Sequence, residues 1–248
     1  MSVRSIDAAE LPQIAAALLE KVRARGPRVH CLMNTVVEKL VADGLSALGA
    51  IPSMTSSPGE VEAFVVKADA LIVNLGTLDA QRREAIRLAV QAAGLHGRPW
   101  VLDPAHCDYS PSRAGFAQEL LSQGPAALRA NEAEYGLLDV PEAIVAMRTG
   151  PSDRIALDGS ALVVRNGHPL IAKVTGTGCL SGAVIAAFLA IEEDRFTAAA
   201  SAMLAMGVAA ERAVAHARGP GSFEPALLDA LHALSGEDII RYAKVSDE

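Results

Sequence analysis

Residues 70–93 read ALIVNLGTLDAQRREAIRLAVQAA, and this stretch decides the expected fold. Its first five residues, 70–74, form an apolar run that ends in an asparagine, which is typical of a strand buried on both faces. Gly76 and Thr77 follow, and the pattern then predicts a long helix over residues 79–93. A buried strand followed by a helix is the repeating unit of a mostly parallel sheet covered by helices.

The same alternation continues toward the N-terminus. Asp7 is a good N-cap for a first helix, and Gly49 is a good residue to end a second one. Ser57, Pro58 and Glu60 together predict the start of a third helix, as N-cap, first helical proline and capping-box acid. The segments predicted on this side are a helix from residue 7, a strand at 29–33, a helix at 36–48 and an extended run at 51–54.

Toward the C-terminus the pattern changes from parallel units to a hairpin and then to helices. The predicted strands are residues 100–102, 126–130, 144–147, 154–157 and 162–165, and the predicted helices are 112–122, 179–192, 197–217 and 225–234. Asp158-Gly159 is a hairpin signal, so the last strands are expected to pair antiparallel. We therefore expect an α/β fold with a mostly parallel central sheet, in a single domain spanning residues 1–248.

Composition narrows the class of protein. The 248 residues are 51% hydrophobic and 21% charged, which excludes intrinsic disorder. A formal net charge of −7 argues against nucleic-acid partners and against binding to an anionic membrane surface. The three cysteines lack CxxC spacing, which disfavours a disulfide framework or a structural zinc site. No signal peptide or membrane-spanning segment is evident, so we expect a cytoplasmic protein.

The segment VTGTGC at residues 174–179 leads directly into a predicted helix. Glycines there allow the backbone N–H groups and the helix dipole to converge on an anion such as a phosphate. The alternative is a glycine-rich turn before a buried helix. At the start of a helix the Cys179 thiol is expected to have a lowered pKa, and it can then serve as a base or position a substrate hydroxyl. The alternative for Cys179 is a small buried side chain.

Two acids follow predicted strands. Asp103 ends one strand and Glu134 comes shortly after the next, so both are expected at the carboxyl edge of the sheet, where they can hold Mg²⁺ directly or through water. The alternative for Glu134 is a capping box with Asn131. Arg129 can reach a nucleotide phosphate, or it can be a solvated arginine.

Several motifs, taken in order, resemble the hydroxyethylthiazole kinase family over roughly residues 10–215. They are VHCLMN (29–34), GLSALGA (44–50), PSM (52–54) with EVE (60–62), NLGTL (74–78), LDP (102–104), Asn131-x-x-Glu134, NGHPL (166–170) and VTGTGC (174–179). The resemblance implies a ribokinase-like fold with helices on both faces of the sheet. It also implies phosphorylation of the primary alcohol of 4-methyl-5-(2-hydroxyethyl)thiazole by ATP with Mg²⁺, in thiamin biosynthesis or salvage.

The resemblance also implies roles for particular residues. Cys179 is the implied catalytic residue, and the implied assembly is a homotrimer with thiazole sites at subunit boundaries. The implied sets are Gly176, Thr177 and Gly178 for the anion hole; Met54, Asn34, Gly76 and Gly176 for the thiazole; Arg129, Thr149 and Asn131 for ATP; and Asp103 and Glu134 for the metal.

The sequence departs from the family pattern in three places. Residues 105–109, AHCDY, replace a small glycine-containing loop, and only some thirteen residues separate the strand ending at residue 130 from the one starting at 144. Residues 147–151, MRTGP, stand where the family has Val-Thr-Gly-Glu at its nucleotide site. These departures keep alternatives open. One is a thiazole-binding or regulatory homologue with weak or no kinase activity. The other is a kinase for another small heterocyclic alcohol, such as a hydroxymethylpyrimidine.

Overall fold

The computed structural model describes residues 6–248 and builds them around one nine-stranded sheet. The strand order is β2-β1-β3-β4-β5-β6-β7-β8-β9. The strands are β1 Arg28–Leu32, β2 Ile51–Ser53, β3 Ala70–Asn74, β4 Trp100–Asp103, β5 Ala127–Asn131, β6 Val145–Thr149, β7 Asp153–Leu157, β8 Ser160–Val164 and β9 Val245–Asp247. The pairs from β2 to β6 are parallel and those from β6 to β9 are antiparallel, as the alternation of segments predicted for most of the chain.

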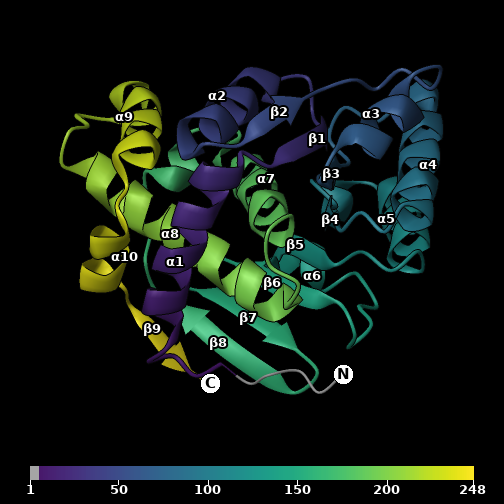
Figure 1. Cartoon of the computed structure of the whole chain (residues 1–248). Coiled ribbons are helices and arrows are strands. Elements are labelled where there is room, and N and C mark those ends of the chain that lie inside the picture. The colour runs from purple at the N-terminus through teal and green to yellow at the C-terminus, as the bar shows by residue number, and fades with distance from the viewer. Residues whose placement is uncertain (1–5) are drawn as a thin grey trace.

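Helices cover both faces of the sheet, which confirms the expected fold class (Figure 1). The helices are α1 Leu11–Arg25, α2 Glu38–Leu48, α3 Val61–Lys67, α4 Ala80–Leu95, α5 Pro111–Leu121, α6 Glu132–Tyr135, α7 Thr177–Leu189, α8 Arg195–Val214, α9 Pro220–Ala233 and α10 Gly236–Tyr242. Within β3, Ile72 packs into the apolar core that includes α1, α7 and α8, whereas Leu71 and Val73 pack into the core with α3, α4 and α5. Successive strand residues point to opposite faces, so a fully buried strand contributes to both cores.

The hairpin between β7 and β8 forms where Asp158-Gly159 predicted it. Leu157 pairs with Ser160, so the loop contains two residues. Asp158 and Gly159 have φ angles of 47° and 80°, the left-handed pair that a tight hairpin turn needs.

Two predicted helix starts are wrong. The first helix begins at Leu11, because Asp7 accepts a hydrogen bond from the N–H of Glu10 in a preceding turn. The third helix begins at Val61, and Ser57 does not cap it. The Glu60 carboxylate instead accepts a hydrogen bond from the hydroxyl of Thr55 (2.5 Å), so it is not available for a capping box.

The connection from β5 to β6 is short but still produces a parallel pair. The four-residue helix α6 is its only regular helix, and the register pairs Asn131 with Thr149. The helix α10 and the edge strand β9 were not predicted from the sequence. The helix predicted at residues 225–234 begins earlier, at Pro220, which occupies the first turn.

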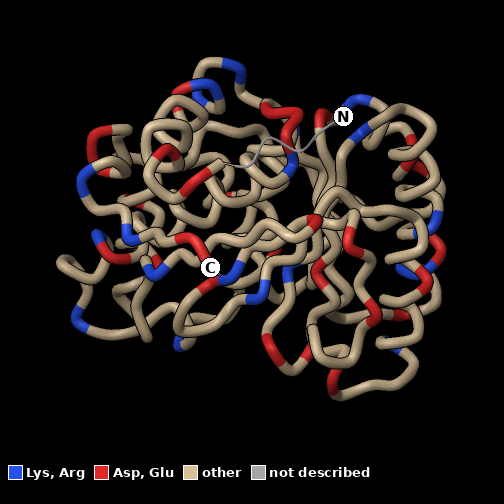
Figure 2. Tube along the Cα trace, turned by 90° about the horizontal axis from the view of Figure 1, so that it is seen from below, with Lys and Arg blue, Asp and Glu red and all other residues tan. Residues whose placement is uncertain are grey.

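Acidic and basic positions both occur over much of the trace (Figure 2). Among the helices of residues 6–248, none has the length and apolarity needed to span a bilayer.

Candidate active site

The carboxyl ends of the central strands open into a cavity of about 890 Å³. One wall is formed by the glycine-rich segment before α7 and by the first turn of that helix, as residues 173–179 line it. The ends of β4, β5 and β6 form another part of the lining, because they bring Asp103, Arg129 and Thr149 to the same cavity. Ligands collect at this edge in open α/β sheets, so the cavity lies where the strand pattern predicted a site.

The start of α7 presents free backbone donors to this cavity. The first intrahelical bond is donated by the N–H of Leu180 to the carbonyl of Gly176 (2.8 Å). The N–H groups of Thr177, Gly178 and Cys179 precede that bond and have no partner within the helix. Because those residues line the cavity, the arrangement suits an anion.

Glycine is required at two positions of this turn for different reasons. Gly176 has a φ of 99°, and a Cβ there would lie 2.8 Å from a methyl carbon of Val37. A Cβ on Gly178 would lie 2.5 Å from Nη2 of Arg129. The absence of a side chain at residue 178 therefore allows a guanidinium group to approach the helix start.

The Cys179 thiol is neutral, contrary to the expected lowering of its pKa. Burial, with the nearby Asp103 carboxylate, raises the pKa of Cys179 to about 12. Its Sγ accepts a hydrogen bond from Nδ2 of Asn74 at 3.3 Å, which opposes this rise only in part. The half charge of a helix dipole is thus outweighed by desolvation and a full negative charge.

Asp103 is completely buried and is held by three groups. Its Oδ2 accepts a hydrogen bond from Asn74 Nδ2 (2.7 Å), its Oδ1 accepts one from the N–H of Ala105 (3.2 Å), and Arg129 Nη1 lies 3.8 Å from Oδ1. Burial raises the pKa of Asp103, Arg129 opposes the rise, and the Glu134 carboxylate adds to it. The two acids therefore share one electrostatic environment, as their positions after neighbouring strands predicted.

Glu134 forms the capping box that the sequence offered as its alternative role, and it also lies at the cavity. Its Oε2 accepts a hydrogen bond from the N–H of Asn131 (3.0 Å) and completes a capping box, while Oε1 accepts one from the N–H of His106 (2.7 Å). Glu134 also lines the cavity and is almost fully buried. Each carboxylate oxygen keeps a second lone pair, so a hydrated cation can still be held there.

His106 and Asp108 extend this acidic corner. One ligand atom from each, with one from Glu134, lies within 4.8 Å of the other two. These residues belong to the AHCDY segment that departs from the family pattern, and His106 adopts a left-handed φ of 60°. The loop after β4 therefore places a histidine and an additional acid beside the cavity.

Arg129, Thr149 and Asn131 lie together on β5 and β6. Arg129 Nη2 donates a hydrogen bond to Oγ1 of Thr149 at 3.0 Å, and its Nε is buried without a hydrogen-bond partner among the described residues. All three residues line the cavity. The structure thus brings together the residues expected for ATP, and the guanidinium keeps donors for a phosphate.

The cavity lining also contains residues that the sequence analysis missed. Met203 and Met206 of α8 give it an apolar wall, and Asp153 adds a carboxylate. Burial raises the pKa of Asp153 to about 6, although the N–H of Gly150 and the charge of Arg129 oppose the rise. Methionines in a buried helix have no sequence signal that separates wall residues from core residues.

Of the residues expected for thiazole, Gly176 lines this cavity, whereas Asn34, Gly76 and Met54 lie outside its lining. Asn34 and Gly76 are in contact, since a Cβ on Gly76 would lie 2.6 Å from Nδ2 of Asn34. Asn74 joins them to the cavity, because its Oδ1 accepts the N–H of Gly76 while its Nδ2 reaches Cys179. Met54 is half-buried and directly follows β2.

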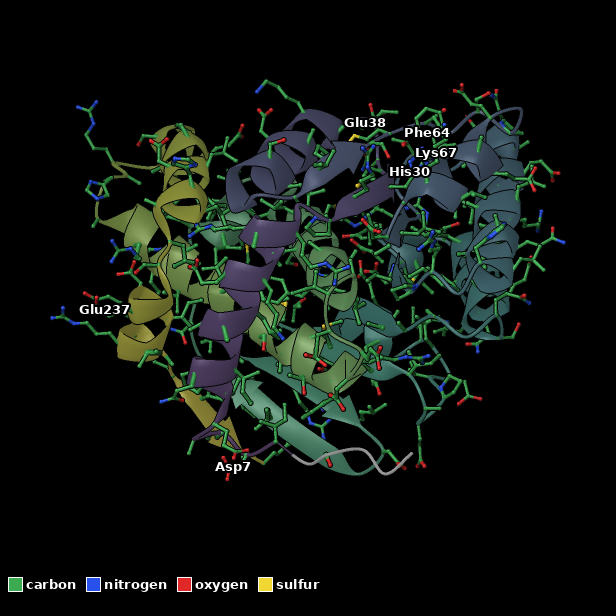
Figure 3. All side chains as sticks on the ribbon, in the orientation of Figure 1. Asp7, His30, Glu38, Phe64, Lys67 and Glu237 are labelled. Atoms are coloured by element: carbon green, nitrogen blue, oxygen red, sulfur yellow. The ribbon has the colours of Figure 1, made fainter. Side chains whose placement is uncertain are left out.

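The strand end that carries Met54 is fixed by a buried histidine. His30 Nδ1 lies 2.9 Å from Oγ of Ser53, and its ring packs 5.4 Å from that of Phe64 (Figure 3). Burial lowers the pKa of His30 to about 4, so the ring is neutral at physiological pH.

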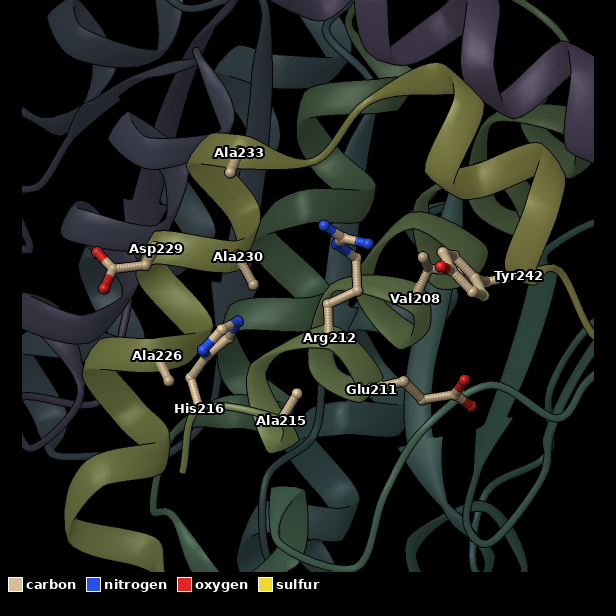
Figure 4. Close-up of a pocket in the computed structure, with 10 residues that line it drawn as sticks. All are labelled: Val208, Glu211, Arg212, Ala215, His216, Ala226, Asp229, Ala230, Ala233 and Tyr242. Carbon is tan, nitrogen blue, oxygen red and sulfur yellow. The ribbon is translucent and has the colours of Figure 1, made fainter. Parts of the chain in front are cut away.

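A second hollow, of about 590 Å³, lies among α8, α9 and α10 (Figure 4). Four of its ten lining residues are alanine, and two of its charged residues already form ion pairs, Arg212 with Asp238 at 2.8 Å and Glu211 with Lys244 at 2.9 Å.

Comparisons with known proteins agree on one family. The model of the hydroxyethylthiazole kinase family matches residues 19–143 and 139–237. The chain is 58% identical over 235 residues to a probable hydroxyethylthiazole kinase of Agrobacterium fabrum, covering 94% of this chain and 95% of that protein. The two parts of the family match meet at residues 139–143, in the short connection between α6 and β6.

One solved structure supports the same family, and a more distant one shows the fold. The hydroxyethylthiazole kinase protein of Pyrococcus horikoshii superposes with a TM-score of 0.92 at 34% identity, covering 95% of this chain and 99% of that one. A ribokinase-like superfamily protein of Enterococcus faecalis superposes with a TM-score of 0.61 at 16% identity, covering 89% and 95%, which identifies the fold.

Proposed function

The chain belongs to the hydroxyethylthiazole kinase family, and from this premise we propose how its cavity transfers a phosphoryl group from ATP to the primary alcohol of 4-methyl-5-(2-hydroxyethyl)thiazole. Family membership makes the chain a kinase that acts on an alcohol, in thiamin biosynthesis or salvage. One observation carries the proposal for the site. The free N–H groups at the start of α7 line the same cavity as two buried acids and an arginine.

In this proposal the start of α7 binds the transferring phosphate. Phosphoryl transfer depends mainly on positioning and on stabilising the charge that spreads over the phosphate oxygens. The N–H groups of Thr177, Gly178 and Cys179 donate to those oxygens, and Arg129 adds a positive charge from β5. Gly178 lets the arginine come close to the same phosphate.

Cys179 orients the alcohol in this mechanism. With a pKa of about 12 the thiol keeps its proton at neutral pH, so it does not act as a strong base. A loose transition state requires little deprotonation of the attacking alcohol before transfer. The thiol therefore holds the hydroxyl in line with the phosphate by hydrogen bonding.

Asp103 and Glu134 are the residues that would hold Mg²⁺, through water, because their oxygens already accept hydrogen bonds from the protein. When bound, the ion neutralises charge on the phosphate oxygens. Arg129, Thr149 and Asn131 bind the remaining phosphates, and the apolar wall of Met203 and Met206 suits the adenine.

The thiazole itself is assigned to Asn34, Gly76 and Met54, with the backbone of Gly176. Asn34 and Gly76 are connected to the phosphate side through Asn74, which contacts both Gly76 and Cys179. We further propose that the protein acts as a homotrimer in the cytoplasm, with the thiazole sites at the subunit boundaries.

The proposal is tested by steady-state kinetics on the Cys179→Ala variant with ATP and the thiazole alcohol. We expect kcat to fall at least about 100-fold, the range for loss of a positioned catalytic group, with a small change in thiazole affinity. Cys31→Ala is a matched control, because Cys31 is a buried strand thiol that does not line the cavity. Near-normal turnover of Cys179→Ala would remove the thiol from the mechanism.

The short connection after α6 motivates a second candidate, a homologue that binds thiazole but no longer transfers phosphate. Calorimetry with a non-hydrolysable ATP analogue and with the thiazole alcohol, in separate titrations, distinguishes the two. Thiazole binding without nucleotide binding would favour the binding homologue.

The AHCDY loop motivates a third candidate, a kinase for another heterocyclic alcohol, because it places His106 and Asp108 beside the cavity. A phosphorylation screen that includes a hydroxymethylpyrimidine tests it. Preferential turnover of the pyrimidine would replace thiazole as the substrate.

A further inference from the structure

Asn74 is the last residue of β3, is fully buried, and pairs in register with Asp103 on β4. Its side chain makes three hydrogen bonds. Nδ2 donates to Oδ2 of Asp103 at 2.7 Å and to Sγ of Cys179 at 3.3 Å, and Oδ1 accepts from the N–H of Gly76 at 2.9 Å. One side chain therefore contacts an acid, the thiol and the loop proposed for substrate.

The orientation of this carboxamide follows from its partners. The N–H of Gly76 can only donate, so the oxygen of Asn74 must face it. The amide nitrogen then faces Asp103 and Cys179, and each of its two hydrogens has one acceptor. A flipped carboxamide would place an oxygen against the carboxylate and lose all three hydrogen bonds.

The backbone around Asn74 is also held in place. Buried Arg82 donates from Nη2 to the carbonyl oxygen of Asn74 at 3.3 Å. On the other side α7 packs closely on the sheet, since a Cβ on Gly182 would lie 3.2 Å from Cδ1 of Ile72. Asn74 and the first turn of α7 thus have little freedom to move relative to each other.

We propose that Asn74 is a positioning residue for phosphoryl transfer, which fixes the Cys179 thiol relative to the Asp103 carboxylate and couples both to the Gly76 loop. This inference rests on the proposed function of the same site. The sulfur accepts the Asn74 hydrogen bond, so its own S–H is free to point into the cavity, where the alcohol would lie.

Two substitutions separate this role from simple packing. Asn74→Asp keeps the volume and the acceptor for Gly76, but replaces both donated hydrogens with a carboxylate beside Asp103. Asn74→Ala removes all three bonds. For both variants we expect kcat to fall about 100-fold or more, with KM for ATP changed less than about threefold, because the nucleotide residues are untouched. Ser201→Ala, a truncation of a buried polar residue on α8, is the control and should keep wild-type kinetics.

A double-mutant cycle asks whether Asn74 acts through the thiol. In the Cys179→Ala background, Asn74→Ala should cost at least tenfold less in kcat than it costs in the wild type. Fully additive losses would overturn the proposal.

Alkylation gives a readout that does not depend on activity. At pH 8.5, iodoacetamide should label Cys179 more slowly in Asn74→Asp than in the wild type, because the thiolate loses a donor and gains a negative neighbour. Peptide mass spectrometry separates Cys179 from Cys31 and Cys107. Faster labelling would mean that the site has merely loosened, and would overturn the positioning role even if the kinase assignment stands.

A measurement on the native side chain covers the case in which the Asn74 variants do not fold. The chain has four asparagines, at residues 34, 74, 131 and 166, so a ¹⁵N-asparagine spectrum is sparse. Cys179→Ala should shift the Asn74 carboxamide signal and leave that of Asn166, which donates to the carbonyl of Tyr242, unchanged. An unmoved Asn74 signal would contradict the N–H···S contact.

Discussion

Asp103 illustrates how single residues at this site balance opposing electrostatic effects. Complete burial favours the neutral acid, whereas Arg129 and the two donated hydrogen bonds favour the carboxylate. Glu134 then adds a like charge, and the pKa of Asp103 is raised. A bound cation would relieve this repulsion, so the charge arrangement of the free cavity is suited to one.

Asp153 gives a prediction at the residue scale. Its pKa is raised to about 6 in the folded chain, above the ordinary value near 3.8. Between about pH 4 and pH 6 the unfolded chain therefore ionises this group first, and the free energy of unfolding decreases as pH rises. Asp153→Asn, which still accepts the N–H of Gly150, should be about 1–2 kcal/mol more stable than the wild type at pH 7.

Urea unfolding at pH 4 and pH 7 measures this effect. The stability difference between variant and wild type should be near zero at the lower pH and grow toward the higher one. Buried His30 has the opposite pH dependence, but it is present in both proteins and cancels from the difference. A difference independent of pH would show that Asp153 does not titrate in this range.

The positions of the site residues were easier to predict than their ionisation. Asp103, Glu134 and Cys179 were expected at the cavity because each follows a strand or starts a helix. The thiol pKa was predicted in the wrong direction, because the sequence shows the helix start but not the burial or the carboxylate that packs against it. The sequence pointed to Asn74 only as part of a motif. Its proposed positioning role depends on hydrogen bonds to Asp103 and Cys179, which lie 29 and 105 positions away in the sequence.

At the scale of elements, α7 is fitted to the sheet by residues without side chains. Gly178 admits Arg129 from β5, and Gly182 allows the helix to approach Ile72 of β3. Glycine is unfavourable within a helix by about 1 kcal/mol relative to alanine. Glycine at these two positions lowers the stability of the helix somewhat, but it allows the helix to lie close to the strands.

Gly178→Ala tests the fit between α7 and β5. The added Cβ would lie 2.5 Å from Arg129 Nη2, so the guanidinium must move away from Thr149, while the backbone at residue 178 is ordinary helix. We expect KM for ATP to rise about tenfold, a loss near 1.4 kcal/mol, with an unchanged or slightly higher Tm.

Gly94→Ala on α4 is the matched control, because a Cβ there meets no atom within 4 Å. It should leave the kinetics unchanged. If KM for ATP in Gly178→Ala stays at the wild-type value, Arg129 does not bind the nucleotide from its present position.

Elements with strong local signals were predicted well, and those fixed by tertiary contacts were not. The fully buried β3 and the Asp158-Gly159 hairpin formed as expected. The edge strand β9 has only three residues and exists because it pairs with β8, and Ser57 lost its capping role to the Thr55–Glu60 hydrogen bond. The β8–β9 pairing joins residues far apart in the sequence, so no local window shows it, whereas the Thr55–Glu60 hydrogen bond is local and competes with the capping pattern for the same carboxylate.

At the scale of the whole molecule, different strands of the sheet carry the residues proposed for phosphate transfer and those proposed for thiazole binding. Strands β3 to β6 bring the acids, Arg129 and Thr149 to one edge, and their parallel order survives the short connection after α6. The corner formed by β1, β2, α3 and the turn before α2 carries Asn34 and Met54, two of the residues assigned to thiazole. This corner also exposes apolar side chains, with Val36 71%, Ile51 46% and Phe64 38% exposed.

The exposed corner leads to a prediction about assembly. Val36 lies two residues after Asn34, so a subunit boundary there would border the proposed thiazole site. We expect light scattering to give three times the 25.8 kDa chain mass. Val36→Lys should shift the protein toward monomer and raise KM for the thiazole alcohol about tenfold, because burying an unpaired charge at an interface is costly. KM for ATP should stay the same, since Val36 does not line the nucleotide cavity.

Leu95→Lys, an equally exposed site at the far end of α4, should keep both the mass and the kinetics of the wild type. A wild-type chain that is monomeric yet fully active would refute the boundary site, because one subunit would then contain the whole thiazole pocket.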